Sequence, residues 1–208
     1  MVVREMLANG EFKMNQEKGG REIIFGRQPV REMLRAGRRK LFKFILQGGL
    51  KQSDDVDEML SAVEASGAGV NGGDVRMLDR LTGNRNHQGV AAEVSPYPYV
   101  EIQDILDEGT NRNEPPFILL LDHIQDPHNL GSLLRSAEGA GVHGVVIPVD
   151  RAAAVTPAAA RVSAGAAEHI KVARVVNVVQ VMRKLKEDGV WMTGLEAVED
   201  AREYADAD

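Results

Sequence analysis

The chain has 208 residues, which suits one large domain or two small ones, and its 43% hydrophobic and 27% charged residues are typical of a globular protein with a real core. It contains no cysteine, which excludes a disulfide framework and a thiolate metal site. The formal net charge of −6 argues weakly against a nucleic-acid partner. No stretch has the length of a membrane span or the character of a signal peptide, so we expect a cytoplasmic protein without a membrane partner.

The charge is unevenly distributed along the first half of the chain. Residues 1–20 mix both signs around Gly19-Gly20 and predict a flexible leader. The following segment, 21–51, holds nine basic residues and only two acidic ones. Such an excess is typical of a surface that binds a phosphate backbone, but a solvated basic face would look the same, so charge alone leaves both interpretations open.

Residues 21–94 predict a small α/β domain. Strands are expected around 23–25, 42–46 and 90–94, with a shorter one at Val70. Helices are expected after Pro29, over 54–66, and after the capping residue Asp74. The next segment, 95–116, opens and closes with proline pairs around a short amphipathic piece at 100–106, and it predicts a linker that packs partly on one domain.

Residues 117–150 predict a βαβ unit. An apolar run, 117–121, stops at Asp122; a helical pattern runs from Leu130 to Ala140 with Asn129 as its expected N-cap; and a second apolar run, 145–149, follows. Strands that are apolar throughout are typical of a parallel sheet buried on both faces. Ligands of such sheets bind at the carboxyl ends of the strands, so chemistry is expected between Asp122 and Asn129.

The alternation of strands and helices continues to the end of the pattern. An alanine-rich helix is expected from Thr156-Pro157 to about Gly165, then a strand at 170–175. A helix capped by Asn177 and ended by Gly189 precedes an expected strand at 190–193. The residues at the carboxyl end of that strand are Gly194-Leu195-Glu196, and the remainder is acidic and polar.

One motif in the βαβ unit resembles a known family. The pattern D-x-x-x-D-P-x-N-x-G-x-x-x-R-x-A is similar to the first motif of the SpoU class of RNA ribose 2′-O-methyltransferases, within the SPOUT superfamily, and every fixed position matches: Asp122, Asp126, Pro127, Asn129, Gly131, Arg135 and Ala137. By spacing alone, Asn129 would only cap a helix and Arg135 would be a solvated arginine. The resemblance instead implies that Asn129 and Arg135 are catalytic.

The first domain carries a second resemblance. It is similar to the substrate-binding domain often found ahead of the SpoU catalytic domain, whose fold is like that of an RNA-binding ribosomal protein of the L30e type. The matching residues are Gly26-Arg27 with Val30, the turn at 38–40, and His87-Gln88-Gly89-Val90. The resemblance implies that RNA is bound by Arg27, Arg38, Arg39, Lys40, His87 and Gln88. The residues alone also allow a loop at 87–89 that hydrogen-bonds only its own backbone.

The resemblance implies the whole architecture. We expect an α/β protein with a leader (1–20), an L30e-like RNA-binding domain (21–94), a linker (95–116) and a mostly parallel catalytic domain of the α/β-knot type (117–208). S-adenosylmethionine is the implied cofactor, contacted by Thr193, Gly194 and Leu195, without a metal, and the complete protein is expected to be a homodimer. Two further family motifs are not found before Asp208. The knot segment is therefore expected to be missing, and the 208-residue chain by itself is expected to be inactive.

Three classes of function remain open. The first is an RNA 2′-O-methyltransferase acting on guanosine of 23S ribosomal RNA, with transfer RNA as an alternative substrate. The second is a non-catalytic RNA-binding protein. The third, a nucleotide-binding domain of Rossmann or flavodoxin type, is the least favoured, because Gly139-Ala140-Gly141 follows the helix of the βαβ unit instead of preceding it.

Overall fold

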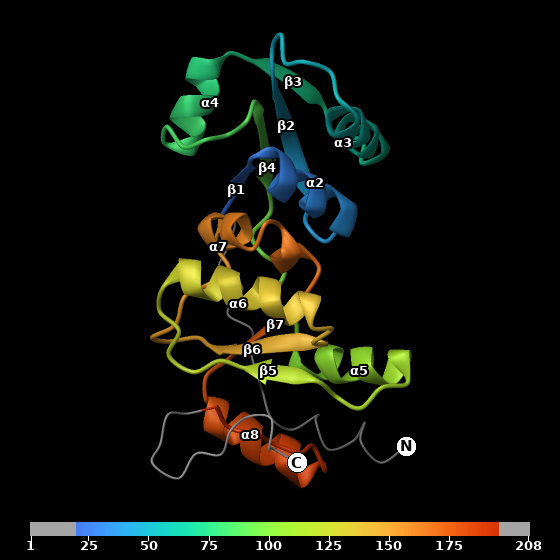
Figure 1. Cartoon of the computed structure of the whole chain (residues 1–208), viewed down its shortest axis with the longest axis vertical. Coiled ribbons are helices and arrows are strands. Elements are labelled where there is room, and N and C mark those ends of the chain that lie inside the picture. The colour runs from blue at the N-terminus through green and yellow to red at the C-terminus, as the bar shows by residue number, and fades with distance from the viewer. Residues whose placement is uncertain (1–19, 196–208) are drawn as a thin grey trace.

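Two sheets of different kinds organise residues 20–195, the part of the chain that the computed structural model describes (Figure 1). The expected leader lies almost wholly outside these residues. The first sheet has the strand order β1-β4-β2-β3, in which β4 pairs antiparallel with both of its neighbours and β2 pairs parallel with β3. Its strands are β1 (Glu22–Phe25), β2 (Leu41–Gln47), β3 (Val70–Gly73) and β4 (Val90–Val94), close to the predicted ranges.

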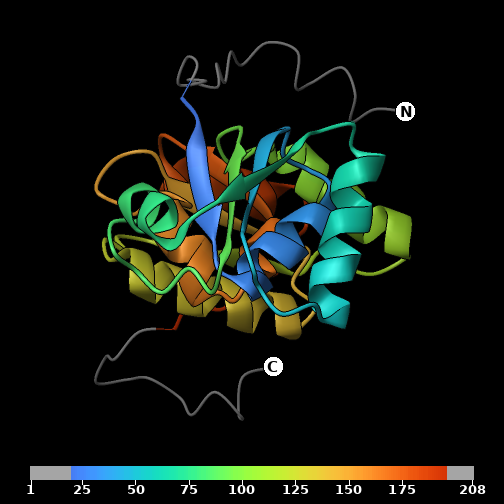
Figure 2. The ribbon, with the colours of Figure 1, turned by 90° about the horizontal axis from the view of Figure 1, so that it is seen from above.

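Helices cover both faces of the first sheet (Figure 2). On one face, α2 (Arg27–Ala36) and α3 (Asp54–Ala65) form a core with Phe44 of β2. On the other, α4 (Val75–Thr82) packs Leu78 against the next residue of the same strand, Ile45. Successive residues of β2 thus serve opposite cores, as the two-residue period of a strand requires. Two of these helices end at a glycine, since Gly37 after α2 and Gly83 after α4 have the left-handed φ angles of 61° and 66°.

The second sheet is parallel and is buried on both faces, as predicted. Its strands β5 (Ile118–Leu120), β6 (Gly144–Pro148) and β7 (Lys171–Val175) follow one another in space as in sequence. The helix α6 (Pro127–Gly139) packs against Val145 and Ile147 of β6, whereas α5 (Ile102–Arg112) and α8 (Val178–Glu187) pack against Val146 on the other face. The predicted α/β fold is confirmed, and the knot stays a prediction.

Two details of the sequence prediction need correction. The short amphipathic piece expected at 100–106 is the longer helix α5, and Val100 just before it donates its N–H to Val172 O at 3.0 Å beside the second sheet. The strand expected at 190–193 does not form. Val190 instead donates its N–H to Leu185 O at the end of α8, and Trp191 is 92% exposed, so this stretch has no sheet partner that would hold it extended.

A buried arginine joins the two halves of the molecule. Arg39, in the loop before β2, has a fully buried side chain and binds the carboxylates of Glu22 in β1 and Glu168 in the second half. Nε of Arg39 lies 2.8 Å from Oε2 of Glu168, which is 1% exposed. Burial opposes the charged guanidinium, but the carboxylates of Glu168 and Glu22 outweigh it and raise the pKa of Arg39. The arginine therefore stays charged at this contact between the two halves. The contact, made by residues 38–39 and 97–98 with residues 165–170, is here termed the joint.

Further contacts surround this ion pair. Arg38 donates to the carbonyl oxygens of Pro98, Glu168 and Ile170 at 2.8–3.2 Å. The Tyr97 hydroxyl donates to the Ile170 carbonyl at 2.7 Å, and burial raises the pKa of Tyr97 to about 12, so the phenol keeps its proton. All these groups converge on the short 3-10 helix η2 (Ala166–Glu168) and the turn after it.

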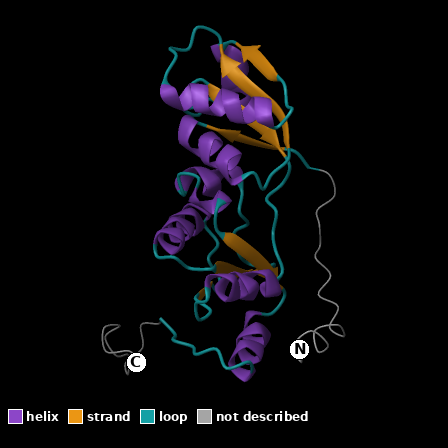
Figure 3. Cartoon of the chain, turned by 90° about the vertical axis from the view of Figure 1, so that its right-hand side faces the viewer, coloured by secondary structure: helices purple, strands orange, loops and turns teal. Residues whose placement is uncertain are grey.

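Close backbone packing completes the joint. Ala160 of α7 (Pro157–Val162) belongs to the core of the first half. A Cβ added to Gly165 would lie 2.5 Å from Cβ of Glu32, so only glycine permits this approach between α2 and the turn after α7. Seen from the side, helices fill the space between the two sheets (Figure 3). The two halves are therefore packed directly on each other.

The buried ion pair gives a stability prediction. Glu168→Gln keeps the shape of the side chain but leaves Arg39 with one carboxylate partner, and it should lower the free energy of unfolding by about 3 kcal/mol. The double variant Arg39→Met/Glu168→Met removes both charges and should be more stable than Glu168→Gln. Urea unfolding followed by circular dichroism measures both. A single variant as stable as the wild type would contradict a role for this pair.

Candidate active site

The segment expected to carry the chemistry leaves the carboxyl end of the second sheet. Leu121 still donates its N–H to Val146 O, and Asp122 then leaves the sheet edge, with its side chain 65% exposed. A second loop, 149–156, leaves the same edge after β6, and the two loops are tied by Ala153 N–H donating to Ile124 O at 2.7 Å. The predicted site therefore consists of two hydrogen-bonded loops at the carboxyl edge of the sheet, where parallel sheets bind ligands.

The start of α6 differs from the prediction in a way that changes the role of Asn129. The N-cap is Asp126, whose Oδ1 accepts from His128 N–H at 3.0 Å, and Pro127 occupies the first helical position. The helix thus begins three residues earlier than expected. Asn129 lies inside the first turn and is exposed. Because Asp126 already performs the capping, the amide of Asn129 is available to a ligand.

One residue at this edge was missed by the sequence analysis. His123 follows Asp122 directly, and its Nδ1 lies 2.8 Å from Oδ1 of that aspartate. Its φ of 56° is left-handed, a conformation that costs energy for a residue other than glycine. Arg151 in the neighbouring loop has a φ of 54°. Two non-glycine residues with left-handed φ angles at one sheet edge are typical of a functional loop. The sequence signal that could have identified His123 is its position directly after an apolar strand.

Arg135 lies on a different surface from Asn129. Six residues of helix separate them, which corresponds to about 9 Å along the axis and about 120° around it. Arg135 is exposed and lines a groove of about 390 Å³ between the two halves of the molecule. The other residues lining this groove are Gln28, Glu32, Glu138, Ser163, Ala164, Ala166 and His169. The structure therefore places Asn129 at the sheet edge and Arg135 in the groove behind it.

The residues expected to contact the cofactor have no strand to position them. Thr193, Gly194 and Leu195 follow α8 in an irregular, exposed segment, and Leu195 is 83% exposed. A Cβ added to Gly194 would meet nothing within 4 Å. Their backbone and side chains are thus accessible to a ligand, and their role in cofactor binding stays a prediction.

The predicted RNA-binding residues of the first half divide into two groups. Arg39 has a fully buried side chain, so the expectation that it binds RNA is wrong. The guanidinium of Arg38 is half-buried and donates to backbone carbonyls of the joint, and its contact with RNA stays a prediction. Lys40 remains exposed, with Nζ 5.3 Å from the centroid of the Phe42 ring. The charge pattern of the turn alone could not show that two of its three cations are used internally.

The loop at 87–89 supports its own fold and the start of α2. His87 is 8% exposed, and its Nδ1 accepts from Gly89 N–H at 2.9 Å, which is the purely local interpretation allowed from the sequence. Gln88 is exposed and accepts from Arg27 N–H at 2.9 Å. This bond replaces the cap that Gly26 cannot supply, and it explains why α2 begins two residues before Pro29. The Arg27 guanidinium pairs with Asp55 at 3.3 Å.

Both halves of the chain match known families. Residues 116–208 match the SpoU rRNA Methylase family, and residues 23–100 match the domain described as RNA 2′-O ribose methyltransferase substrate binding. The chain is 37% identical over 176 residues to a Bacillus subtilis protein named as a TrmH family tRNA/rRNA methyltransferase, covering 85% of this chain and 70% of that protein. A Staphylococcus aureus protein of the same name is 38% identical over 175 residues, covering 84% and 69%.

This chain belongs to the SpoU/TrmH family. A Synechocystis relative, named as an uncharacterized tRNA/rRNA methyltransferase, is 37% identical over 173 residues, or 83% of this chain and 45% of that protein. Among solved structures, the SpoU methyltransferase AviRb of Streptomyces viridochromogenes in complex with AdoMet has a TM-score of 0.64 at 23% identity over 82% of this chain and 61% of its own. The chain thus spans between 45% and 70% of the length of these relatives.

A second solved relative confirms the SpoU/TrmH fold. The AdoMet-bound rRNA methyltransferase of Sinorhizobium meliloti has a TM-score of 0.60 at 20% identity, covering 80% of this chain and 58% of its own. Within residues 20–195, no helix is both long and apolar enough to cross a membrane. In the same part of the chain, no three His, Cys, Asp or Glu side chains are grouped as metal ligands would be.

The SpoU/TrmH motif contains structural as well as exposed positions. Asp126 and Pro127 begin α6, and Ala137 is 4% exposed in the core. Gly131 allows α6 to approach α7, because an added Cβ would lie 2.7 Å from Ala159 O and 2.8 Å from Cβ of Val162. The exposed motif positions that neither cap nor pack the helix are Asp122, Asn129 and Arg135. Packing therefore explains about half of the motif and leaves these three for chemistry.

The capping assignment is tested by a pair of alanine variants. Asp126→Ala removes the cap of α6 and should lower the free energy of unfolding by about 1 kcal/mol. Asn129→Ala removes no cap and should change it by less than about 0.5 kcal/mol. Thermal unfolding of the two variants gives the comparison. If Asn129→Ala proved the more destabilising of the two, the assignment of the cap would be wrong.

The packing role of Gly131 has a control in the same helix. Gly131→Ala forces α6 away from α7 and should cost about 1–3 kcal/mol of unfolding free energy. Gly139→Ala meets nothing within 4 Å and should be neutral or stabilising by up to about 1 kcal/mol, because alanine is the better helix former. Denaturant unfolding of both variants separates close packing from helix propensity. Equal effects of the two substitutions would contradict the packing argument.

Proposed function

We propose that this SpoU/TrmH protein catalyses S-adenosylmethionine-dependent 2′-O-methylation of RNA ribose, with guanosine of 23S ribosomal RNA as its substrate. The observation that carries the proposal is the state of Asn129 and Arg135. Both are exposed on the helix that leaves the ligand-binding edge of a parallel sheet, and neither is needed for the cap or the core. The resemblance of residues 23–100 to a substrate-binding domain supports RNA as the substrate.

The chemistry asks for alignment and charge stabilisation more than for a strong base. S-adenosylmethionine supplies an activated methyl group, which a ribose 2′-hydroxyl attacks in line with the departing sulfur. The hydroxyl is a poor nucleophile at neutral pH, and holding it in line supplies much of the rate. A guanidinium is a cation with five N–H donors, so we propose that Arg135 binds a phosphate and stabilises the oxygen as negative charge develops. The amide of Asn129 orients the ribose.

We propose that S-adenosylmethionine binds beside the second sheet and contacts Thr193, Gly194 and Leu195. The adenosine and methionine parts need accessible backbone and apolar contacts, and the exposed Thr193, Gly194 and Leu195 offer both. No metal is part of the proposal. The proposal includes a cytoplasmic location and a homodimer. The apolar side chains of Val176, Val179 and Trp191, in and around α8, are 78%, 55% and 92% exposed. Exposed apolar side chains that lie together are typical of a contact surface.

Substitution of Arg135 tests the catalytic role. In the complete protein, Arg135→Ala should lower the rate of methyl transfer to ribosomal RNA by on the order of a hundredfold or more, because a charge that stabilises the transition state is lost. The affinity for RNA should fall only a few-fold. Single-turnover transfer of a radiolabelled methyl group at saturating RNA measures the rate directly.

A matched control separates this effect from loss of charge in general. Arg183→Ala removes another exposed helical arginine of the same half and should leave the rate unchanged. A rate for Arg135→Ala within a few-fold of wild type would refute the role. Absence of methyl transfer by the complete wild-type protein, with RNA binding intact, would favour a non-catalytic RNA-binding protein. Transfer to transfer RNA alone would correct the substrate.

A further inference from the structure

One group of arginines in the first half is not used for internal pairing. Arg76 and Arg80 on α4 and Arg85 in the loop after it are exposed, and none forms an ion pair within residues 20–195. The segment with the largest basic excess behaves differently. Its arginines are largely neutralised by carboxylates, as Arg21 is by Glu93 and Arg35 by Glu58 at 2.7 and 2.5 Å. Within residues 20–195, the exposed arginines of this half that form no ion pair therefore lie on α4 and in the loop after it.

The carboxylates near these arginines are already engaged. Asp79 lies 3.3 Å from Nε2 of His87, and Asp74 accepts from Met77 N–H at 2.7 Å as the cap of α4. The helix on the other side of the sheet has the opposite charge. Residues 54–65 of α3 contain five carboxylates and no basic residue, whereas residues 75–86 contain three arginines and one aspartate. A polyanion that approaches the first half is thus attracted to α4 and repelled by α3.

The second half adds a fourth arginine beside α4. The guanidinium of Arg161, an exposed residue of α7, lies 5.7 Å from the centroid of the Phe25 ring. Phe25 packs with Leu78 of α4 in one core cluster. Arg161 thus lies where the surface of α4 meets the second half.

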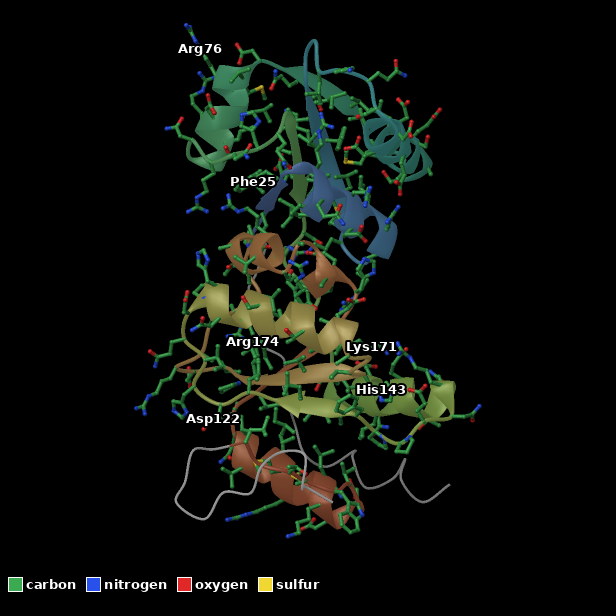
Figure 4. All side chains as sticks on the ribbon, viewed as in Figure 1. Phe25, Arg76, Asp122, His143, Lys171 and Arg174 are labelled. Carbon is green, nitrogen blue, oxygen red and sulfur yellow. The ribbon has the colours of Figure 1, made fainter. Side chains whose placement is uncertain are left out.

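The position of this surface relates it to the candidate active site. In Figure 4, Arg76, Phe25 and Asp122 lie on one side of the molecule, and His143 and Lys171 lie on the other. A bound RNA strand that contacts α4 and continues past Phe25 would therefore lead toward the carboxyl edge of the second sheet. We propose that Arg76, Arg80, Arg85 and Arg161, here termed the arginine face, bind backbone phosphates of the RNA substrate and direct its target ribose to that edge.

This assignment deepens the proposed function, on which it rests, and it replaces the turn at 38–40 as the main RNA contact. Arginine is well suited to the task because its planar guanidinium can bind phosphate oxygens through two hydrogen bonds. Between the cations, Asn84 and Asn86 are exposed, and their amides can donate to and accept from base edges. Contacts to phosphates position the RNA, whereas contacts to base edges select a sequence.

Salt-dependent binding tests the arginine face without requiring catalysis. The probe is a fluorescein-labelled RNA hairpin of about 20 nucleotides, titrated with the full chain at several salt concentrations. The triple variant Arg76→Gln/Arg80→Gln/Arg85→Gln should bind at least about tenfold more weakly, and the slope of log affinity against log salt should fall by about two to three, since each lost phosphate contact contributes about 0.7–0.9.

Two single variants exclude loss of folding as the cause. Arg76→Glu places a negative charge in the first turn of α4, where the helix dipole favours it, so the helix keeps its stability while RNA binding falls. Lys51→Glu reverses an exposed cation of the same half, in the segment that leads to α3, and should leave binding within about twofold. Circular dichroism confirms the fold of each variant.

The outcomes separate this inference from the proposed function. Binding of the triple variant within twofold of wild type, or displacement of the hairpin by polyglutamate of equal charge as readily as by unlabelled RNA, overturns the arginine face as an RNA site. Weaker RNA binding by the triple variant, together with no methyl transfer by the complete wild-type protein, supports the face and contradicts the proposed enzyme. Methyl transfer with an unchanged KM in the triple variant supports the enzyme and overturns the face.

Discussion

The buried ion pair of Arg39 with Glu168 is the constraint on which the arrangement of the two halves depends. A guanidinium without exposed surface needs carboxylates, and it finds them in β1 and in η2, which belong to different halves of the chain. The surrounding bonds of Arg38 and Tyr97 to backbone carbonyls act in the same place. Because charge pairing of this kind tolerates little displacement, it fixes the substrate-binding half relative to the sheet that carries the candidate site.

Internal ion pairs also limit which cations of the first half are available to a polyanion. The basic excess of residues 21–51 suggests a nucleic-acid surface, but most of its arginines neutralise carboxylates of the same molecule. Pairing of this kind lowers the field that a polyanion would experience. The fewer arginines on and just after α4 have no such partners within residues 20–195, so they contribute more to the external field despite the smaller local count.

The candidate active site combines a stable frame with exposed groups. Asp126 begins α6 and Gly131 lets that helix approach α7, so the helix is held at both its start and its packed face. The helix α6 carries the exposed side chains of Asn129 and Arg135. Because they are separated along the helix, Asn129 lies at the sheet edge and Arg135 lies in the groove behind it.

The sequence by itself determined the order of elements, the parallel second sheet and the edge at which Asp122 leaves it, because local periodicity and helix-ending glycines act over a few neighbouring residues. It also determined the family motif. Only the tertiary structure decided that Arg39 is internal, that Asp126 replaces Asn129 as the cap, and that residues 190–193 form no strand. Each of these outcomes depends on a partner far along the chain or on competition between neighbouring caps, and neither is encoded in spacing alone.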